Sequence, residues 1–121
     1  MLNVLVVDDD SDLLEMVSLV LKSHDMKVEC LNKGGLLFQS IATGKPDIVL
    51  MDIYLGDSDG RELCRELKST RQFQNIPVIL YSAGNINEAS VQQSLADDFV
   101  SKPFDISQLV RKINSCTKAG N

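Results

Sequence analysis

Short runs of apolar residues recur along the chain, and several of them end abruptly at an acidic or hydroxyl-bearing residue. A short, mostly apolar run without strict polar alternation is typical of a strand that is buried on both faces of a sheet. The clearest run is Ile48 to Met51, which Asp47 precedes and Asp52 ends. The pattern predicts five strands, at residues 2–7, 27–31, 47–51, 76–81 and 98–101.

Between the strands, apolar residues recur at spacings of three and four, which predicts helices. The clearest series comprises Ile106, Leu109, Val110 and Ile113. The first helix is expected to begin after an N-cap at Asp10 or Ser11 and to bury a stripe made of Leu13, Val17, Val20 and Leu21. Three further helices are predicted: one between residues 34 and 44, one capped by Asp59, and a weak one over residues 86–94.

The five predicted strands alternate with five predicted helices, and the connections between them are short. This order predicts an α/β fold, in which right-handed crossovers place helices on both faces of one parallel sheet. No linker, repeat or low-complexity segment interrupts residues 1–121, so we expect a single domain. Because nothing after the last predicted helix encodes an output domain, we expect either a separate output protein or a longer parent chain.

Composition narrows the class of protein. Of the 121 residues, 44% are hydrophobic and 24% are charged, which is ordinary for a globular domain. A net charge of −5 without a basic face argues against direct binding to nucleic acid. No apolar run is long enough to span a membrane and no signal peptide opens the chain, so we expect a cytoplasmic protein. Cys30, Cys64 and Cys116 are odd in number and far apart, which favours reduced, buried thiols.

Acidic residues follow two of the predicted strands. Asp8 and Asp9 follow the first strand, and Asp52 ends the third. If these strands are neighbours, the three carboxylates converge at the carboxyl edge of the sheet, where α/β folds place their sites. At about 5 Å and an effective dielectric constant of about 20, each like-charged pair costs roughly 3 kcal/mol. We therefore expect a cation there, and hard oxygen ligands suit Mg²⁺.

The same edge carries two further polar groups. Ser82 ends the fourth predicted strand, and Lys102 follows the fifth. Three acids, a hydroxyl and an ammonium form a site suited to phosphorylation of a carboxylate, because a metal and a lysine neutralise the transferred group.

The sequence resembles the receiver domain of two-component response regulators in five motifs, at residues 7–9, 51–52, 59–60, 81–83 and 101–104. The resemblance covers essentially the whole chain. It implies a flavodoxin-like fold with strand order 2-1-3-4-5. It also implies a signalling switch rather than a turnover enzyme, in which Asp52 accepts a phosphoryl group from a histidine kinase or a histidine phosphotransfer protein.

The resemblance also implies a set of metal ligands. Asp9 and Asp52 would bind Mg²⁺ directly, and Asp8 would bind it through water. The backbone carbonyl of Tyr54 would complete the ligands that the protein supplies.

Other positions acquire roles in the switch by the same resemblance. Lys102 would pair with the phosphoryl group, Ser82 would donate a hydrogen bond to it, and Phe99 would be the switch aromatic. The Lys102–Pro103 peptide bond is expected to be cis. The output surface is expected on residues 84–99 and the adjoining face of the last helix, because that segment is poor in helix formers and apolar anchors.

The chain departs from the family pattern at three positions. Gly56 stands where a proline is frequent, Phe99 replaces the commoner tyrosine, and Leu95 stands where a helix-ending glycine is common. The segment from Ser82 to Phe99 is also about two residues shorter than in chemotaxis-type receivers. These departures make the fourth helix the least secure of the predicted elements.

Other functions fit these motifs less well. A calcium loop fails because Leu55 would occupy its first ligand position. A phosphatase with an aspartyl nucleophile normally has a second aspartate where Tyr54 stands. A receiver-like interaction module that works without phosphorylation remains the alternative. His24 is expected to be a helix-capping or surface residue, and a solvated helix face is expected for Arg61, Glu62, Arg65 and Lys68.

Overall fold

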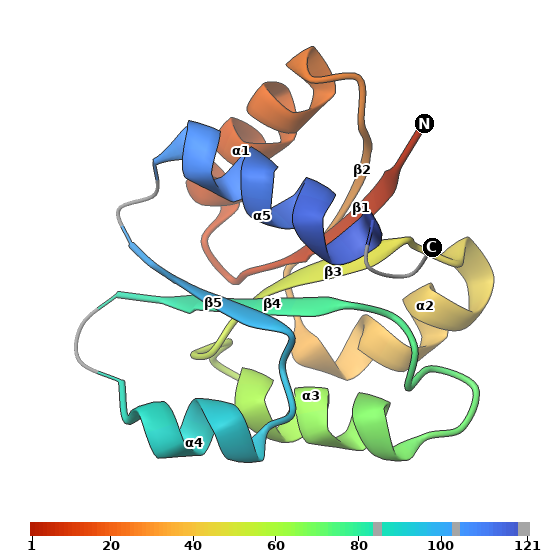
Figure 1. The fold of residues 1–121 in the computed structure, drawn as a ribbon, viewed down its shortest axis with the longest axis vertical. Helices are drawn as coiled ribbons and strands as arrows, with labels where there is room; N and C mark the ends of the chain where they lie inside the picture. The colour runs from red at the N-terminus through yellow and green to blue at the C-terminus, as the bar shows by residue number, and fades with distance from the viewer. Residues whose placement is uncertain (84–85, 103–104, 119–121) are drawn as a thin grey trace.

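The computed structural model describes residues 1–83, 86–102 and 105–118 of the chain (Figure 1). Gly84 and the Lys102–Pro103 peptide bond, on which two expectations fall, lie outside the described residues. None of the helices in the described part is long and apolar enough to span a membrane.

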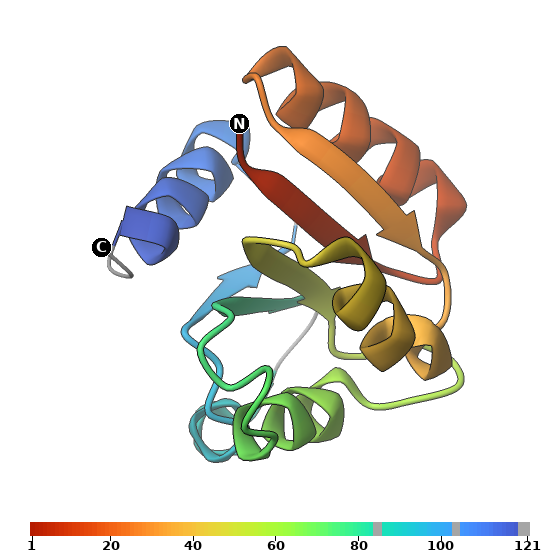
Figure 2. The same cartoon turned by 90° about the vertical axis from the view of Figure 1, so that its right-hand side faces the viewer.

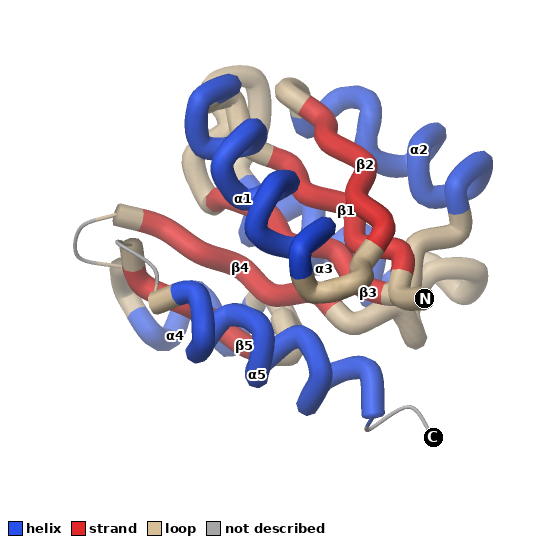
Figure 3. Tube along the Cα trace, turned by 90° about the horizontal axis from the view of Figure 1, so that it is seen from above, coloured by secondary structure: helices blue, strands red, loops and turns tan. Residues whose placement is uncertain are grey.

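Five parallel strands form the central sheet in the order β2-β1-β3-β4-β5, which confirms the fold expected from the sequence (Figure 3). The strands are β1 (Asn3–Val7), β2 (Lys27–Leu31), β3 (Ile48–Asp52), β4 (Val78–Ser82) and β5 (Asp98–Ser101). β4 begins two residues later than predicted, directly after Pro77, which has no amide proton for the sheet. β1 and β3 are hydrogen-bonded neighbours, as the clustering of the acids requires.

Helices cover both faces of the sheet. They are α1 (Ser11–Ser23), α2 (Leu37–Gly44, after a 3₁₀ turn at Gly34–Leu36), α3 (Gly60–Ser69), α4 (Glu88–Gln93) and α5 (Ile106–Lys118). In Figure 1, α1 and α5 lie above the sheet, whereas α2, α3 and α4 lie below it, and Figure 2 shows the same division from the side. Each layer of helices closes one of two separate hydrophobic clusters.

The buried stripe of α1 differs from the prediction. Leu14, Val17 and Leu21 are buried, whereas Leu13 and Val20 are only partly covered. Apolar residues stand side by side at Leu13 and Leu14, and again at Val20 and Leu21, so spacing alone did not distinguish the two rows. The N-cap is Asp10, whose carboxylate accepts hydrogen bonds from the Asp12 and Leu13 amides at 3.0 and 3.2 Å.

The three cysteines are free thiols, as expected, but their burial varies. Cys64 on α3 is buried and Cys116 on α5 is partly buried, whereas Cys30 is exposed. The expectation of a buried thiol was wrong for Cys30, which lies on the edge strand β2. Burial raises the pKa of the Cys64 thiol to about 11.

The solvated face predicted for α3 is only partly confirmed, because Glu62 and Arg65 are exposed whereas Arg61 and Lys68 are half-buried. Arg65 Nε donates to the carbonyl of Gln93 at the end of α4, at 3.1 Å. Lys68 Nζ lies 2.7 Å from the carboxylate of Asp97, directly before β5. Arg61 also bonds α4. Arg61 and Arg65 therefore connect α3 to the short α4, in which no residue is buried.

Candidate functional site

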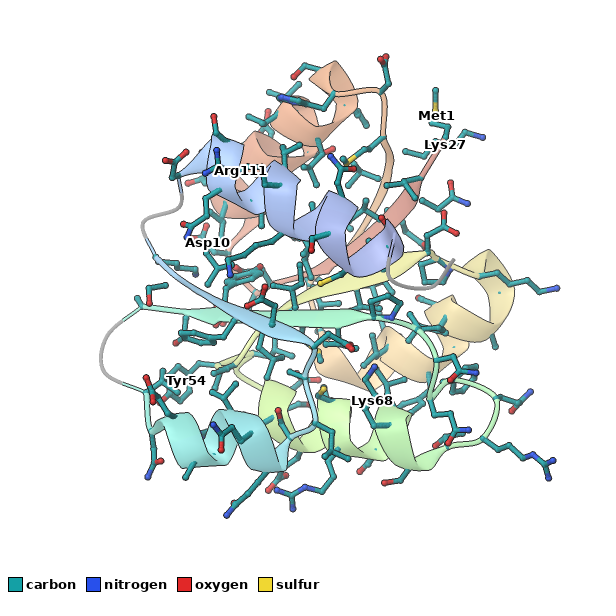
Figure 4. The ribbon with its side chains drawn as sticks, viewed as in Figure 1. Met1, Asp10, Lys27, Tyr54, Lys68 and Arg111 are labelled. Carbon is teal, nitrogen blue, oxygen red and sulfur yellow. The ribbon has the colours of Figure 1, made fainter. Side chains whose placement is uncertain are left out.

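The carboxyl ends of the strands bring three aspartates together. Asp8 follows β1, Asp9 is next to it, and Asp52 is the last residue of β3. One carboxylate oxygen from each lies within 4.8 Å of the others. The pairing of Val7 with Met51 sets the residues that follow them, Asp8 and Asp52, side by side. Figure 4 shows Asp10 and Tyr54, which flank the cluster in sequence, at this end of the sheet.

The three acids differ in exposure. Asp8 is 0% exposed and Asp52 is 6% exposed, whereas Asp9 lies at the surface. The cluster therefore has an enclosed side and an open side. Carboxylate oxygens are hard ligands, and two or three carboxylates with open positions suit Mg²⁺, which keeps several of its own waters. The donor set at this edge therefore fits the ion expected from the sequence.

Asp52 lies between a backbone donor and an ammonium group. Its Oδ1 accepts a hydrogen bond from the Tyr54 amide at 3.1 Å, and its Oδ2 lies 3.3 Å from Lys102 Nζ. Burial raises the pKa of Asp52, the Tyr54 hydrogen bond opposes that rise, and the negative charge of Asp8 adds to it. The deprotonated carboxylate is consequently costly in the absence of a further cation.

Asp8 has donors on both of its oxygens. The Asp10 amide donates to Oδ1 at 2.9 Å, and the Tyr81 hydroxyl donates to Oδ2 at 2.8 Å. Lys102 Nζ reaches the same Oδ2 at 3.4 Å, so one ammonium bridges Asp8 and Asp52. Burial, and then the charge of Asp8, raise the pKa of Tyr81, so the phenol keeps its proton at neutral pH.

The contact between Tyr81 and Asp8 was not foreseen from the sequence, although Tyr81 lies in a motif that carries the resemblance. A tyrosine near the end of a buried strand signals that its hydroxyl will need a polar partner. The identity of that partner depends on which strands lie side by side.

Ser82 and Phe99 occupy neighbouring strands. Ser82 is buried at the end of β4, and its Oγ donates to the carbonyl of Ala83 at 3.1 Å rather than to an acid. Phe99 in β5 pairs with Leu80 and packs, partly buried, against the hydrophobic cluster under α3 and α4. The structure thus places Ser82 at the carboxyl end of β4 and Phe99 within β5, packed against the hydrophobic cluster.

The loop after Asp52 is a tight turn. The Leu55 amide donates to the Ser58 carbonyl at 3.2 Å, and the Gly60 amide donates to the Ile53 carbonyl at 2.7 Å. Gly56 has a φ of +80°, which the ring of a proline cannot adopt. The φ of Gly56 therefore explains the missing proline. The loop also passes close to the acid cluster, because a Cβ on Gly56 would lie 3.3 Å from Asp9 Oδ2.

Known proteins share this arrangement. A family profile described as the response regulator receiver domain matches residues 4–114. The DNA-binding response regulator MtrA of Mycolicibacterium smegmatis is 30% identical over 114 residues, which make up 93% of this chain and 49% of that protein. This chain thus spans about half the length of that curated relative.

Solved structures agree with the sequence comparison. A response regulator from Chloroflexus aurantiacus superposes with a TM-score of 0.91 at 27% identity, over 97% of this chain and 98% of the other. The BeF₃-activated N-terminal receiver domain of Klebsiella pneumoniae RstA gives a TM-score of 0.85 at 27% identity, over 96% and 98% of the two chains. With the sheet order and the acid cluster already in place, these matches leave one conclusion: the chain belongs to the receiver domain family of two-component response regulators.

Proposed function

We propose that this chain works as a phosphoryl-accepting switch, in which Asp52 is phosphorylated by a histidine kinase or a histidine phosphotransfer protein. The observation that carries the proposal is the position of Lys102 Nζ, 3.3 Å from Asp52 Oδ2 within a cluster of three acids. This ammonium is already next to the carboxylate that would gain further negative charge. Receiver domains are signalling switches rather than turnover enzymes, and we assign this chain the same role.

Asp52 is favoured over its two neighbours as the acceptor. Asp8 is completely enclosed and has donors on both oxygens, so a phosphoryl donor cannot reach it. Asp9 is exposed, with no ammonium among the contacts described for it. Asp52 ends the strand between β1 and β4, and its Oδ2 faces only the lysine among the described contacts.

Receiver domains bind Mg²⁺ at an acidic site, and the three aspartates form such a cluster. We assign direct ligation to Asp9 and Asp52, ligation through water to Asp8, and a fourth contact to the backbone carbonyl of Tyr54. When bound, Mg²⁺ neutralises negative charge on the phosphoryl oxygens.

The chemical step belongs to Asp52. A carboxylate oxygen bonds to phosphorus while the P–N bond of a phosphohistidine breaks, and the leaving imidazole keeps the electron pair and takes up a proton. Lys102 would move from the acids to the new phosphoryl oxygens, where its charge stabilises the product. The Ser82 hydroxyl would rotate away from the Ala83 carbonyl to donate to the same group.

The signal would pass to an output protein through α4 and β5. α4 has only six residues. Val91 in α4 and Ile86 before it are only partly buried, and both pack against the same hydrophobic cluster as Phe99. A rearrangement of Ser82 and Phe99 would therefore act first on residues 84–99 and on the adjoining face of α5. We expect an output protein to bind there and, because the chain has a net charge of −5, no direct contact with nucleic acid. The cytoplasm remains our proposed location.

Mass spectrometry tests the acceptor. Acetyl phosphate with Mg²⁺ should add one phosphoryl group to the wild type, because a small donor can replace the kinase. Asp52→Asn should gain none, whereas Asp57→Asn, which alters a loop carboxylate bound to the Gly34 and Gly35 amides, should be labelled like the wild type. Equal labelling of Asp52→Asn would refute the assignment. A wild type that is never labelled and ignores Mg²⁺ would favour an interaction module that works without phosphorylation.

A further inference from the structure

Tyr81 lies at the centre of the site without a role in the scheme above. Its side chain is 1% exposed and points across the sheet from β4 to the end of β1. The hydroxyl lies 2.8 Å from Asp8 Oδ2 and 3.4 Å from the Val7 carbonyl oxygen. Because a hydroxyl has a single proton, the closer carboxylate receives it.

Two donors share the same oxygen of Asp8. Lys102 Nζ lies 3.4 Å from Asp8 Oδ2, a weaker contact than the hydrogen bond from Tyr81. The ammonium also lies 5.1 Å from the centroid of the Tyr81 ring, within the range of a cation–π interaction. Tyr81 therefore contacts both groups: its hydroxyl binds Asp8, and its ring lies beside the ammonium of Lys102.

We propose that Tyr81 is a positioning residue that satisfies Asp8 so that Lys102 stays available for the phosphoryl group on Asp52. This inference rests on the proposed function of the site. Lys102 has to leave Asp8 before it can pair with a phosphoryl group, so every donor that replaces it on Asp8 makes that move easier. The ring of Tyr81 supplies a second, weaker contact, and the Lys102 ammonium can stay beside this ring while it shifts.

Removing the hydroxyl changes this balance. In Tyr81→Phe the ring remains, but Asp8 Oδ2 loses its closest donor and becomes a buried carboxylate oxygen in need of another. Lys102 is already within 3.4 Å, so its charge-assisted hydrogen bond to Asp8 should shorten and strengthen. The Lys102 ammonium is then held by Asp8 and is less available to the phosphoryl group on Asp52.

Beryllofluoride, which mimics a phosphoryl group on an aspartate, gives the first readout. At saturating Mg²⁺, calorimetry or fluorine NMR should show that the dissociation constant for beryllofluoride rises roughly fivefold in Tyr81→Phe, as expected for the loss of one hydrogen bond. Thr70→Val is the matched control, because it removes one hydroxyl bonded to Glu66 on α3, away from the acid cluster, and should change binding less than twofold.

A double-mutant cycle separates positioning from general damage to the fold. In a Lys102→Met background, the additional change Tyr81→Phe should have no effect on beryllofluoride binding, because no ammonium remains to be misplaced. An equal loss in both backgrounds would overturn the proposal. A cooperative urea unfolding curve shows that Tyr81→Phe is folded before its beryllofluoride binding is compared.

A second readout needs neither metal nor phosphate mimic. In the unliganded Tyr81→Phe protein, the ammonium protons of Lys102 should exchange with water more slowly than in the wild type, as followed by NMR of the side-chain nitrogen. If both the exchange of the Lys102 ammonium protons and the binding of beryllofluoride are unchanged, the role of Tyr81 is refuted, but the proposed function of the site is not. A wild type that fails to bind beryllofluoride would instead refute the proposed function.

Discussion

Arg61 joins the loop that follows Asp52 to helix α4 through Ser90. Its Nη1 donates to the Ser90 hydroxyl at 3.1 Å, while Nη2 pairs with the carboxylate of Asp59 at 2.7 Å. The guanidinium carbon also lies 5.8 Å from the centroid of the Tyr54 ring, two residues after the proposed acceptor. One side chain therefore contacts the start of α3, the loop beside the acid cluster, and the segment expected to carry the output.

This contact predicts that Arg61→Ala loosens α4. No residue of α4 is buried, so its stability depends strongly on bonds from α3. Backbone hydrogen exchange over residues 88–93 should accelerate roughly fivefold in the variant, as expected when about 1 kcal/mol of local stability is lost. Arg71→Ala, at an exposed position, is the control and should leave that exchange unchanged. Unaltered exchange in Arg61→Ala would show that the contact does not hold the helix.

Substitution of Leu95 by glycine should stabilise the folded protein. Leu95 has a φ of +68°, and its side chain is 54% exposed, so it has the strain of a left-handed residue with little packing in return. Leu95→Gly should raise the free energy of unfolding by about 1 kcal/mol, measured by urea denaturation. Leu36→Gly is the matched control, because Leu36 is similarly exposed but has a φ of −94°; it should lower stability. A loss of stability in Leu95→Gly would contradict this account.

The sequence was sufficient for the sheet and for the three acids, but not for contacts between elements far apart in the chain. Buried parallel strands can be recognised in a sequence because both of their faces are apolar, and the ends of two such strands locate Asp8 and Asp52. The partner of Tyr81 could not be read in the same way, because Asp8 lies 73 residues away. Arg65 bonds a backbone carbonyl 28 residues away, which no pattern of side chains reveals.

The raised pKa of Asp52 predicts a stability that depends on pH. Between the unfolded and folded pKa values, the folded state binds a proton that the unfolded state does not, so stability falls as pH rises through this window. Without Mg²⁺ at pH 7, Asp52→Asn should therefore be more stable than the wild type. The difference should shrink as pH falls and the wild-type carboxyl is protonated. Urea unfolding at several pH values measures it, and a variant less stable than the wild type at pH 7 would contradict the prediction.

Mg²⁺ should stabilise the wild type by mass action. At a free concentration 100 times the dissociation constant, the gain in the free energy of unfolding should be about 2.7 kcal/mol, visible as a rise in melting temperature. Asp9→Asn should remove this gain without harming the metal-free protein, because Asp9 is exposed. Asp12→Asn, on the first turn of α1, should keep it. A wild-type melting temperature indifferent to millimolar Mg²⁺ would exclude the metal site.

Phosphorylation should change the packing of α4 and β5 more than that of any other element outside the acid cluster. The Ser82 hydroxyl now bonds the Ala83 carbonyl, so recruiting it to a phosphoryl group on Asp52 alters the end of β4. Phe99 lies on the adjacent strand, opposite Leu80, and its half-buried ring can follow that change. α4 has little packing of its own to resist the movement.

Hydrogen exchange with Mg²⁺, compared with and without beryllofluoride, measures this response. The largest change should fall in residues 86–99, which include Phe99 and the two groups that α3 bonds, the Ser90 hydroxyl and the Gln93 carbonyl. Asp52→Asn treated in the same way is the control and should show no response, since beryllofluoride needs the carboxylate. A principal change in α1 or α2 would place the output surface elsewhere. The combination of this experiment with Arg61→Ala then tests the route: if the Ser90 contact transmits the signal, the response of residues 88–93 to beryllofluoride should be smaller in the variant.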